Sequence, residues 1–242
     1  MSQPEYHQEE PTGQITGVRV ALVRDNEDPE NLGRVKLQYP WRDADDESPW
    51  ARIATNMTGD DYGSYFLPEV GEEVLVAFEN GDIHNPVVMG SLWSGNRKPP
   101  EDNSDGENDI RTIKTRSGHQ IEFDDGDEGA ITVETAGGHE LRFDDDSDSV
   151  TVTDTSGNSI EMDAGSDEIS LSASDTIRLD ANKIQLSAKQ EVDIDSKGKV
   201  NISGAQQTDL TSKGPLNVES SALLEVSSSG IVTVSGSLIQ LN

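Results

Sequence analysis

The stretch IRLDANKIQLSAKQEVDIDSKGKVNI (residues 177–202) decides the fold of the second half of this chain. It places two aliphatic residues, separated by one polar residue, at intervals of seven or eight positions. Because alternate residues of a β-strand point to the same side, both members of a pair lie on one face of a short strand. Ten such positions follow one another: Ile169/Leu171, Ile177/Leu179, Ile184/Leu186, Val192/Ile194, Val200/Ile202, Thr208/Leu210, Leu216/Val218, Leu224/Val226, Val232/Val234 and Ile239/Leu241.

A short, fixed period indicates that the chain stacks the same unit again and again. We call residues 169–242 the octad segment and its ten pairs the aliphatic ladder. Two inward side chains per unit are too few to form a core within one chain. Winding several copies together would bury them, and the product would be a stiff rod.

The overall composition suits a thin, surface-rich protein better than a compact enzyme. Hydrophobic residues make up 32% of 242 residues, and even with 22 glycines the apolar share stays below that of ordinary globular proteins. There is no Cys, so disulfides and thiolate metal sites are excluded. No run of 18 apolar residues is present, and MSQPEYHQEE (1–10) does not resemble a secretory signal.

The net charge of −29 is unevenly distributed, since residues 101–168 carry 21 acidic and 4 basic side chains. Such a surface repels phosphate backbones, so we expect no nucleic-acid partner. The acidic residues suit a well-solvated surface, and adaptation to high salt is an alternative explanation.

The first hundred residues are organised as short strands separated by turn residues. Alternating or β-rich runs occupy residues 17–23, 34–39, 50–54, 73–78 and 86–92. Five strands without a helical period predict a small closed barrel over residues 13–95, after a flexible arm at residues 1–12. Residues 96–109 contain Pro99, Pro100 and many polar residues, which predicts a linker.

A longer repeat fills residues 110–168. SGHQIEFDD (117–125) returns as GGHELRFDD (137–145) and, more weakly, as SGNSIEMDA (156–164). Each unit predicts a strand, an acidic turn and a return strand such as residues 130–133. We therefore expect a hairpin-rich section that leads into the octad segment.

The barrel region closely resembles the contractile-tail spike family that includes phage baseplate assembly protein V and the valine-glycine-repeat protein of type VI secretion. The resemblance rests on DPENLGRVK (28–36), YPW (39–41), WAR (50–52), GSYFLPEVGEEVLVAF (63–78) and PVVMGSL (86–92). The Ser-Gly-His repeats also look like this family's entry into its β-helix.

This resemblance implies an all-β fold, with an N-terminal five-stranded OB-fold barrel followed by a C-terminal intertwined triple-stranded β-helix. The helix would be a homotrimeric prism whose faces combine strands of three chains. About a dozen residues precede the barrel, so we expect the hub to be a separate protein. A lysozyme domain between barrel and helix is not expected, because only the short linker occupies that position.

The function implied is that of a central spike, which connects hub and inner tube to a tip protein and mechanically pierces the target envelope. The particle would be a virion tail baseplate, or an extracellular or cytoplasmically assembled injection particle. A conical tip protein of the proline-alanine-alanine-arginine repeat type would cover the blunt apolar end formed by Ile239 and Leu241. Its interface would consist of Leu238, Ile239, Leu241 and Asn242.

The candidate metal and catalytic residues favour structural explanations. The acidic clusters at residues 124–128 and 144–148 lack calcium-loop spacing and fall where hairpins turn, so solvated turns are favoured over cation sites. His119 and His139 occupy equivalent repeat positions, which suits packing better than metal binding, and His7 and His84 have no ligand-like neighbours. We expect no catalytic residues, no metal, no cofactor and no enzyme activity.

The sequence leaves two alternative functions. A β-solenoid adhesin or polysaccharide-degrading tail spike would need an exposed sugar site, yet no Phe, Tyr or Trp occurs after Phe143. Trp41, Trp50, Trp93 and Tyr65 all lie in the barrel region, where core or interface packing is the usual role. An oligonucleotide-binding module would match the barrel type, but the acidity of residues 1–100 opposes it.

Overall fold

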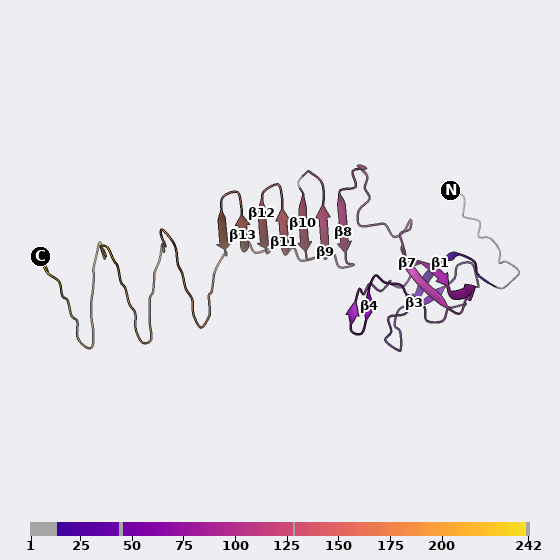
Figure 1. Cartoon of the computed structure of the whole chain (residues 1–242), viewed down its shortest axis with the longest axis horizontal. Coiled ribbons are helices and arrows are strands. Elements are labelled where there is room, and N and C mark those ends of the chain that lie inside the picture. The colour runs from indigo at the N-terminus through magenta and orange to yellow at the C-terminus, as the bar shows by residue number, and fades with distance from the viewer. Residues whose placement is uncertain (1–13, 44–45, 128, 241–242) are drawn as a thin grey trace. The chain divides into compact units, whose positions relative to one another are not determined.

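The computed structural model describes residues 14–43, 46–127 and 129–240 (Figure 1). Within these ranges the protein is all-β, with one short 3₁₀ helix at Glu79–Gly81. The expected flexible arm at residues 1–12 lies outside the described residues. The chain divides into two compact units, residues 1–178 and residues 179–242.

The first unit begins with a curled five-stranded sheet in the order β2-β1-β6-β7-β3. Its two ends meet through Val35 and Ala51, whose N–H groups each donate to the other's carbonyl oxygen at 3.0 and 2.7 Å. This closure removes the exposed sheet edge and confirms the predicted barrel. The strands are β1 (Val18–Asp25), β2 (Lys36–Gln38), β3 (Arg52–Ile53), β6 (Glu73–Phe78) and β7 (Pro86–Leu92).

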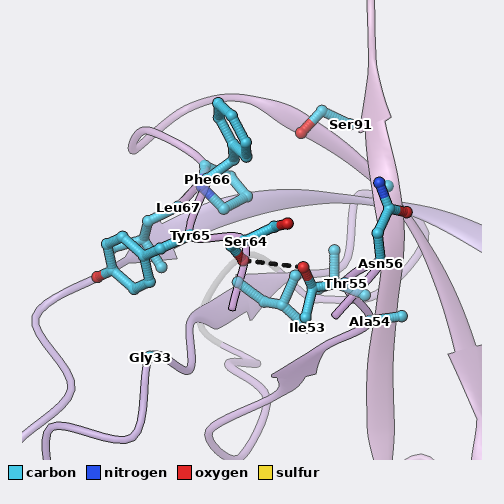
Figure 2. A pocket seen from close by; sticks show the side chains of 13 residues that line it. Gly33, Ile53, Ala54, Thr55, Asn56, Ser64, Tyr65, Phe66, Leu67 and Ser91 are labelled. Atoms are coloured by element: carbon cyan, nitrogen blue, oxygen red, sulfur yellow. Dashed lines mark hydrogen bonds between the residues drawn. The ribbon is translucent and has the colours of Figure 1, made fainter. Parts of the chain in front are cut away.

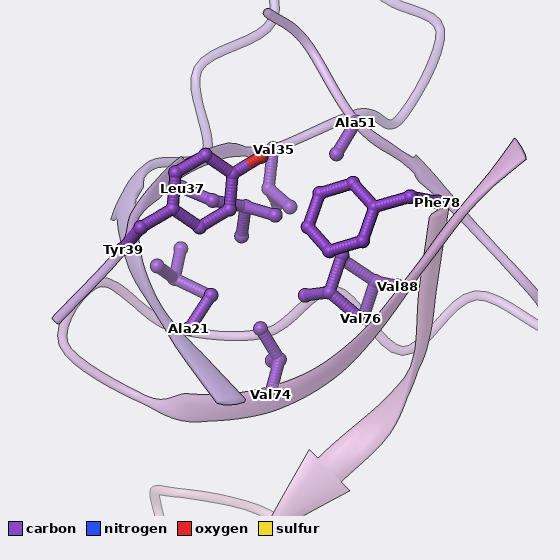
Figure 3. Close-up of a cluster of buried hydrophobic side chains, with 10 residues drawn as sticks. Ala21, Val35, Leu37, Tyr39, Ala51, Val74, Val76, Phe78 and Val88 are labelled. Carbon is purple, nitrogen blue, oxygen red and sulfur yellow. The ribbon is translucent and has the colours of Figure 1, made fainter. Parts of the chain in front are cut away.

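The barrel interior is filled by side chains that alternate along these strands (Figure 3). Val74, Val76 and Phe78 of β6 point inward while their neighbours remain partly exposed. Tyr39 is almost fully buried, with its ring centroid 5.8 Å from that of Phe78. The remaining buried residues are Ala21, Val23, Val35, Leu37, Ala51 and Val88.

A carboxylate fixes the loop between β1 and β2. The oxygens of Asp28 accept the backbone N–H groups of Glu30, Leu32 and Arg34, and the Arg34 guanidinium donates twice more at 2.8 Å. The loop contains two residues with positive φ, Asn31 and Gly33. The Asp28 side chain therefore holds a tight turn that includes a left-handed non-glycine residue.

One small hairpin was not expected from the sequence. β4 (Thr58–Gly59) and β5 (Tyr62–Gly63) pair within a stretch rich in Gly and Asp. Two-residue strands produce no alternation long enough to detect. In this hairpin Tyr62 lies close over Gly59, where a side chain would collide with its ring, so the position favours glycine.

A seven-stranded antiparallel sheet follows, in which each strand pairs with the next in sequence. The repeats at residues 117–125, 137–145 and 156–164 form the strand-turn-strand units that their sequences predict. The strands are β8 (Ile110–Lys114), β9 (Gln120–Asp124), β10 (Ala130–Glu134), β11 (Glu140–Asp144), β12 (Ser149–Thr153), β13 (Ser159–Asp163) and β14 (Glu168–Ser172).

The second unit follows a zigzag path in which no strand is assigned between residues 179 and 240 (Figure 1). Bends recur every seven or eight residues, at 182, 189–190, 197–198, 205–206, 213–214, 221–222, 229–230 and 237. The period of the ladder is therefore present, but the backbone pairing expected of short strands is not. Residues 179–240 contain no strand that could supply ladder partners, so pairing of the expected kind would require strands of other chains.

Serine side chains help to form these bends. The hydroxyls of Ser196, Ser212 and Ser228 each accept the backbone N–H two residues ahead, at 3.0–3.2 Å, and each time the donor is a glycine. Ser220 makes the same contact with the N–H of Ala222. Small polar residues between the aliphatic pairs thus turn the chain at a regular interval.

Candidate functional site

The most extensive functional feature of the first unit is one face of the seven-stranded sheet. Strand register aligns its apolar side chains in two rows, which we call the apolar face. One row holds Ile113, Ile121, Val133, Leu141, Val152, Ile160 and Leu171. The other holds Phe123, Ile131, Phe143, Val150, Met162 and Ile169, with Arg111 at its β8 end.

Most of these side chains remain open to solvent in the single chain. Phe123 and Phe143 are each 42% exposed, and Ile160 and Met162 are each 44% exposed. Contiguous apolar surface of this kind is rare on monomeric proteins and marks an interaction surface. The structure thus contains a sheet whose apolar side is left uncovered.

The opposite face of the same sheet is polar. Along its middle row the register brings Thr112, Glu122, Thr132, Arg142, Thr151, Glu161 and Ser170 side by side. In antiparallel sheets of this kind, the polar face is usually solvated and the apolar face packs against another surface.

The aliphatic ladder begins within the apolar face. Its first pair, Ile169/Leu171, is part of β14 and lies opposite Met162 and Ile160. From Ile177 to Ile239 the aliphatic first members of the pairs are 49–57% exposed, and the second members from Leu179 to Val234 are 61–78% exposed. The same two-residue pattern therefore runs from the hairpins through the octad segment without being buried.

The barrel carries a separate surface cavity of about 260 Å³ (Figure 2). Figure 2 shows Tyr65 and Phe66 on one side of it and Asn56 on the other, with Thr55 donating a hydrogen bond to the carbonyl oxygen of Ser64 at 2.8 Å. Tyr65 and Phe66 are 73% and 72% exposed. Its lining includes no carboxylate, imidazole or amine, so it offers no acid–base pair for catalysis.

Trp41 packs against the barrel core, as expected for an aromatic in this region. Trp50 is partly buried beneath Lys36, whose Nζ lies 5.6 Å from the ring centroid. Trp93 is instead 71% exposed. The barrel aromatics are thus divided between the interior and an open surface.

The acidic clusters form hairpin turns. Asp124, Asp144 and Asp163 each use a carboxylate oxygen to accept a backbone N–H two or three residues ahead. The N–H of Ser147, with the Arg142 guanidinium, lowers the pKa of Asp144 to about 2. Among the residues that the structure describes, no group of three or more His, Asp or Glu side chains could hold a metal ion. Glu128 lies outside the described residues.

The two repeat histidines are not brought together into a site. Nδ1 of His119 accepts the backbone N–H of Ala136 at 3.1 Å, which joins two successive turns. Asn158, two repeats later, does the same with its Oδ1 and the N–H of Ser174 at 3.0 Å. In the first and third repeats, the residue at this position thus links one turn to the next. His84 lies in a barrel loop, and His7 is outside the described residues.

Two of the four expected tip residues can be located. Leu238 is 82% exposed and Ile239 is 49% exposed, whereas Leu241 and Asn242 lie outside the described residues. Sequence analysis missed two other exposed aliphatics, Leu223 and Ile231, because they stand next to ladder pairs rather than within them. Across the described ranges, no helix has the length and apolar character needed to span a bilayer.

Comparison with known proteins adds to this geometry. Residues 19–93 match the family described as the type VI secretion system/phage-baseplate injector OB domain. The spike protein VgrG5 of Pseudomonas aeruginosa is 40% identical over 102 residues, which cover 38% of this chain and 13% of that protein. The spike protein VgrG2a of the same organism is 38% identical over 72 residues, covering 28% of this chain and 9% of that protein.

A third relative carries a different name. The actin cross-linking toxin VgrG1 of Vibrio cholerae is 31% identical over 121 residues, which cover 47% of this chain and 11% of that protein. The matched segments thus span only about a tenth of the length of these relatives. The family match contains all five barrel strands except the first residue of β1. The barrel is therefore an injector OB domain of the type VI secretion and phage-baseplate family, and this part of the chain is similar to VgrG spike proteins.

Proposed function

We propose that this chain is the central spike of a contractile, phage-like injection particle and acts as a homotrimer. The injector OB domain and the spike proteins among its relatives support this function. The observation that carries the proposal is the uncovered apolar face of the seven-stranded sheet, together with the exposed aliphatic side chains of the ladder.

A trimer would bury these apolar side chains in its interior. Three copies of the apolar face can meet around one axis, with the polar faces outward, and the ladder continues the same interior. Burying a half-exposed Ile, Leu or Val stabilises the assembly by roughly 1 kcal/mol per side chain. In the octad segment, neighbouring chains would supply the backbone partners that a single chain lacks, and the faces of the prism would combine strands of three chains.

The barrel is the part that would meet a separate hub protein and the inner tube. Its exposed apolar residues support a protein contact there: Leu32, Tyr65, Phe66 and Val70 are each more than half exposed. The Asp28–Arg34 contacts hold the loop that presents Leu32. We assign residues 13–95 to this collar, 96–109 to a linker, 110–168 to the hairpin section and 169–242 to the octad segment.

A tip protein, conical and of the proline-alanine-alanine-arginine repeat type, would bind residues 238–242. The exposed Leu238 and Ile239 support an apolar contact. In this account the spike works mechanically: contraction drives the tube forward, and the rigid prism concentrates that force on a small area of the target envelope. It performs no chemical reaction of its own and is a component of the assembled particle.

The proposed role can be tested by counting this chain in purified particles. A tagged chain, expressed in the cells that make it, should sediment with intact particles at three copies for each tube. Val232→Asp should abolish this association by placing a charge in the prism interior, whereas Thr233→Asp, on the other face of the same segment, should retain it. A chain that stays entirely with the unassembled protein would contradict the spike function.

A further inference from the structure

The hairpins of the seven-stranded sheet turn alternately at its two edges, and the two edges differ in chemistry (Figure 1). The turns of one edge, which we call the acidic edge, contain eleven acidic residues and no basic residue. The turns of the other edge, the Gly-His edge, contain one acidic residue, one basic residue and two histidines. The acidic edge consists of residues 124–129, 144–149 and 163–168, and the Gly-His edge of residues 115–119, 135–139 and 154–158.

Both edges carry polar groups that the chain itself does not use. The carboxylates of Asp127 and Asp146 are exposed, and neither has a hydrogen bond or an ion pair within the described ranges. On the other edge, Nδ1 of His119 accepts the Ala136 N–H, so a neutral imidazole carries its proton on Nε2. This exposed N–H is a donor, and the unused carboxylates are acceptors.

Each edge is also hollowed. On the acidic edge, a cavity of about 350 Å³ is lined by the turns at residues 144–149 and 163–168 and by Met162 of the apolar face. On the Gly-His edge, a cavity of about 390 Å³ is lined by His139, by Asn158 and by apolar side chains of β13 and β14. Side chains of the apolar face line both cavities, so an assembly that covers this face reaches them as well.

We propose that the two edges are complementary, so that the acidic edge of one copy packs against the Gly-His edge of the next. This inference rests on the proposed homotrimer. A cyclic assembly closes by joining one surface of each chain to a different surface of its neighbour. The eleven acidic residues of one chain then meet a nearly neutral edge with donors, whereas two acidic edges would repel each other.

Symmetry also specifies which turns meet. A rotation about an axis parallel to the stacking of the strands moves no residue along that axis. Successive turns of one edge lie two strand spacings apart, about 9.6 Å, and the turns of the other edge lie halfway between them. With strands perpendicular to the axis, the turn at residues 154–158 of one chain therefore enters the hollow between the turns at residues 144–149 and 163–168 of the next.

The same rule brings donors and carboxylates together. The turn that carries Asp127 lies between the turns of His119 and His139 of the neighbour, so the Nε2–H of His119 can donate to the Asp127 carboxylate. The turn that carries Asp146 lies between those of His139 and Asn158. Hollows and polar groups thus support one interlocked register.

The test uses engineered cysteines in the full-length trimer, since the chain has no Cys of its own. The double variant Asp146→Cys, Ser156→Cys has one thiol on each edge, and oxidation should link neighbouring chains into covalent dimers and trimers on a non-reducing gel. A second opposite-edge variant, Asp146→Cys, Ala136→Cys, should link as well. A short bis-maleimide reagent provides the same measurement without the strict geometry of a disulfide.

Two matched controls have both cysteines on one edge: Asp127→Cys with Asp146→Cys, and Ala136→Cys with Ser156→Cys. Both should remain single chains, because turns about 9.6 Å apart are beyond the reach of a disulfide within one chain.

Native mass separates this inference from the trimer itself. Linked chains in the opposite-edge variants, with single chains in both controls, would support the contact between unlike edges. A trimer in which only a same-edge variant links, or in which neither opposite-edge variant links with either reagent, would overturn it and leave the spike function standing. A monomeric wild-type protein would overturn both.

Discussion

At the scale of single residues, Asp28 is the most constrained side chain of the barrel. The Arg34 guanidinium, together with the backbone N–H groups of Glu30, Arg34 and Leu32, holds the pKa of Asp28 well below its usual range. Its side chain is only 3% exposed, and it holds a loop containing two residues of positive φ. Loss of this carboxylate charge would leave the Arg34 guanidinium and three N–H groups with a poorer acceptor.

This arrangement predicts how barrel stability depends on pH. Because the pKa of Asp28 is lower in the folded than in the unfolded state, its carboxylate stabilises the folded barrel. This stabilisation is fully present above about pH 4, the usual pKa of an unfolded Asp, and is lost as the pH falls toward the folded-state pKa. Asp28→Asn should lower the melting temperature at pH 7 by about 5 °C or more. Between pH 4 and pH 2, the melting temperature of this variant should decrease less than that of the wild type. Thermal melts across that range provide the measurement.

The control for this prediction is Asp60→Asn, at an exposed position in the turn between β4 and β5. This variant should melt as the wild type does at each pH. Equal pH dependence in the Asp28→Asn variant and the wild type would show that the loop carboxylate does not stabilise the barrel.

His119 provides a second test at this scale. Its Nδ1 accepts the Ala136 N–H, and the Oδ1 of Asn158 accepts the Ser174 N–H at the equivalent repeat position. His119→Asn should therefore keep the wild-type melting temperature, whereas His119→Ala should lose about 0.5–1 kcal/mol of folding free energy with the hydrogen bond. Chemical denaturation of the three proteins measures the difference, and a stable alanine variant would argue against the linking role.

At the scale of elements, a charged substitution on the apolar face has different effects in a monomer and in the proposed trimer. Val152 of β12 is 44% exposed in the single chain, so replacing it with a charged residue would cost little if the protein were a monomer. In the proposed trimer it would be buried, so Val152→Glu should destabilise the assembly by at least about 2 kcal/mol per chain. Trimer mass and melting temperature provide the measurement.

The matched control lies one residue away on the same strand. Thr151 belongs to the polar face, where it lies opposite Arg142 and Glu161, so Thr151→Glu should leave the trimer intact. Equal behaviour of the two glutamate variants would contradict the assignment of the apolar face to the interior.

Most elements of the first unit could be predicted from sequence because their signals are local. The alternation of apolar and polar residues predicted the five barrel strands. The repeats that begin with Ser-Gly-His and its variants predicted the hairpins of the seven-stranded sheet. The two-residue strands β4 and β5 could not be predicted, since neither is long enough to alternate. The octad segment differs from these elements. Its repeat is visible in the sequence, but the backbone pairing of its strands would require other copies of the chain.

Some features of the candidate site could likewise be predicted from sequence, and others could not. The ladder pairs and the turn-forming role of Asp124 and Asp144 followed from spacing alone. The continuity of the apolar face depends on strand register, which a sequence does not specify. The Asp28 contacts to Glu30, Leu32 and Arg34 depend on the path of a loop, and only three-dimensional structure displays that path.

At the scale of the whole molecule, the uncovered apolar surface is the dominant fact. One face of the seven-stranded sheet is apolar and uncovered, and the ladder side chains of the octad segment are exposed as well, whereas the polar face of the sheet can remain in water. A single chain would expose this surface to water at a large free-energy cost, and three chains would bury it along a common axis. The oligomeric state in solution therefore tests the central claim directly.

The measurement is the native mass of the purified full-length protein, by light scattering or native mass spectrometry at low micromolar concentration. Our account predicts a species of three times the 26.2 kDa chain, unchanged on dilution. A well-folded species of 26.2 kDa would contradict it, since the aliphatic ladder would then have no interior to fill.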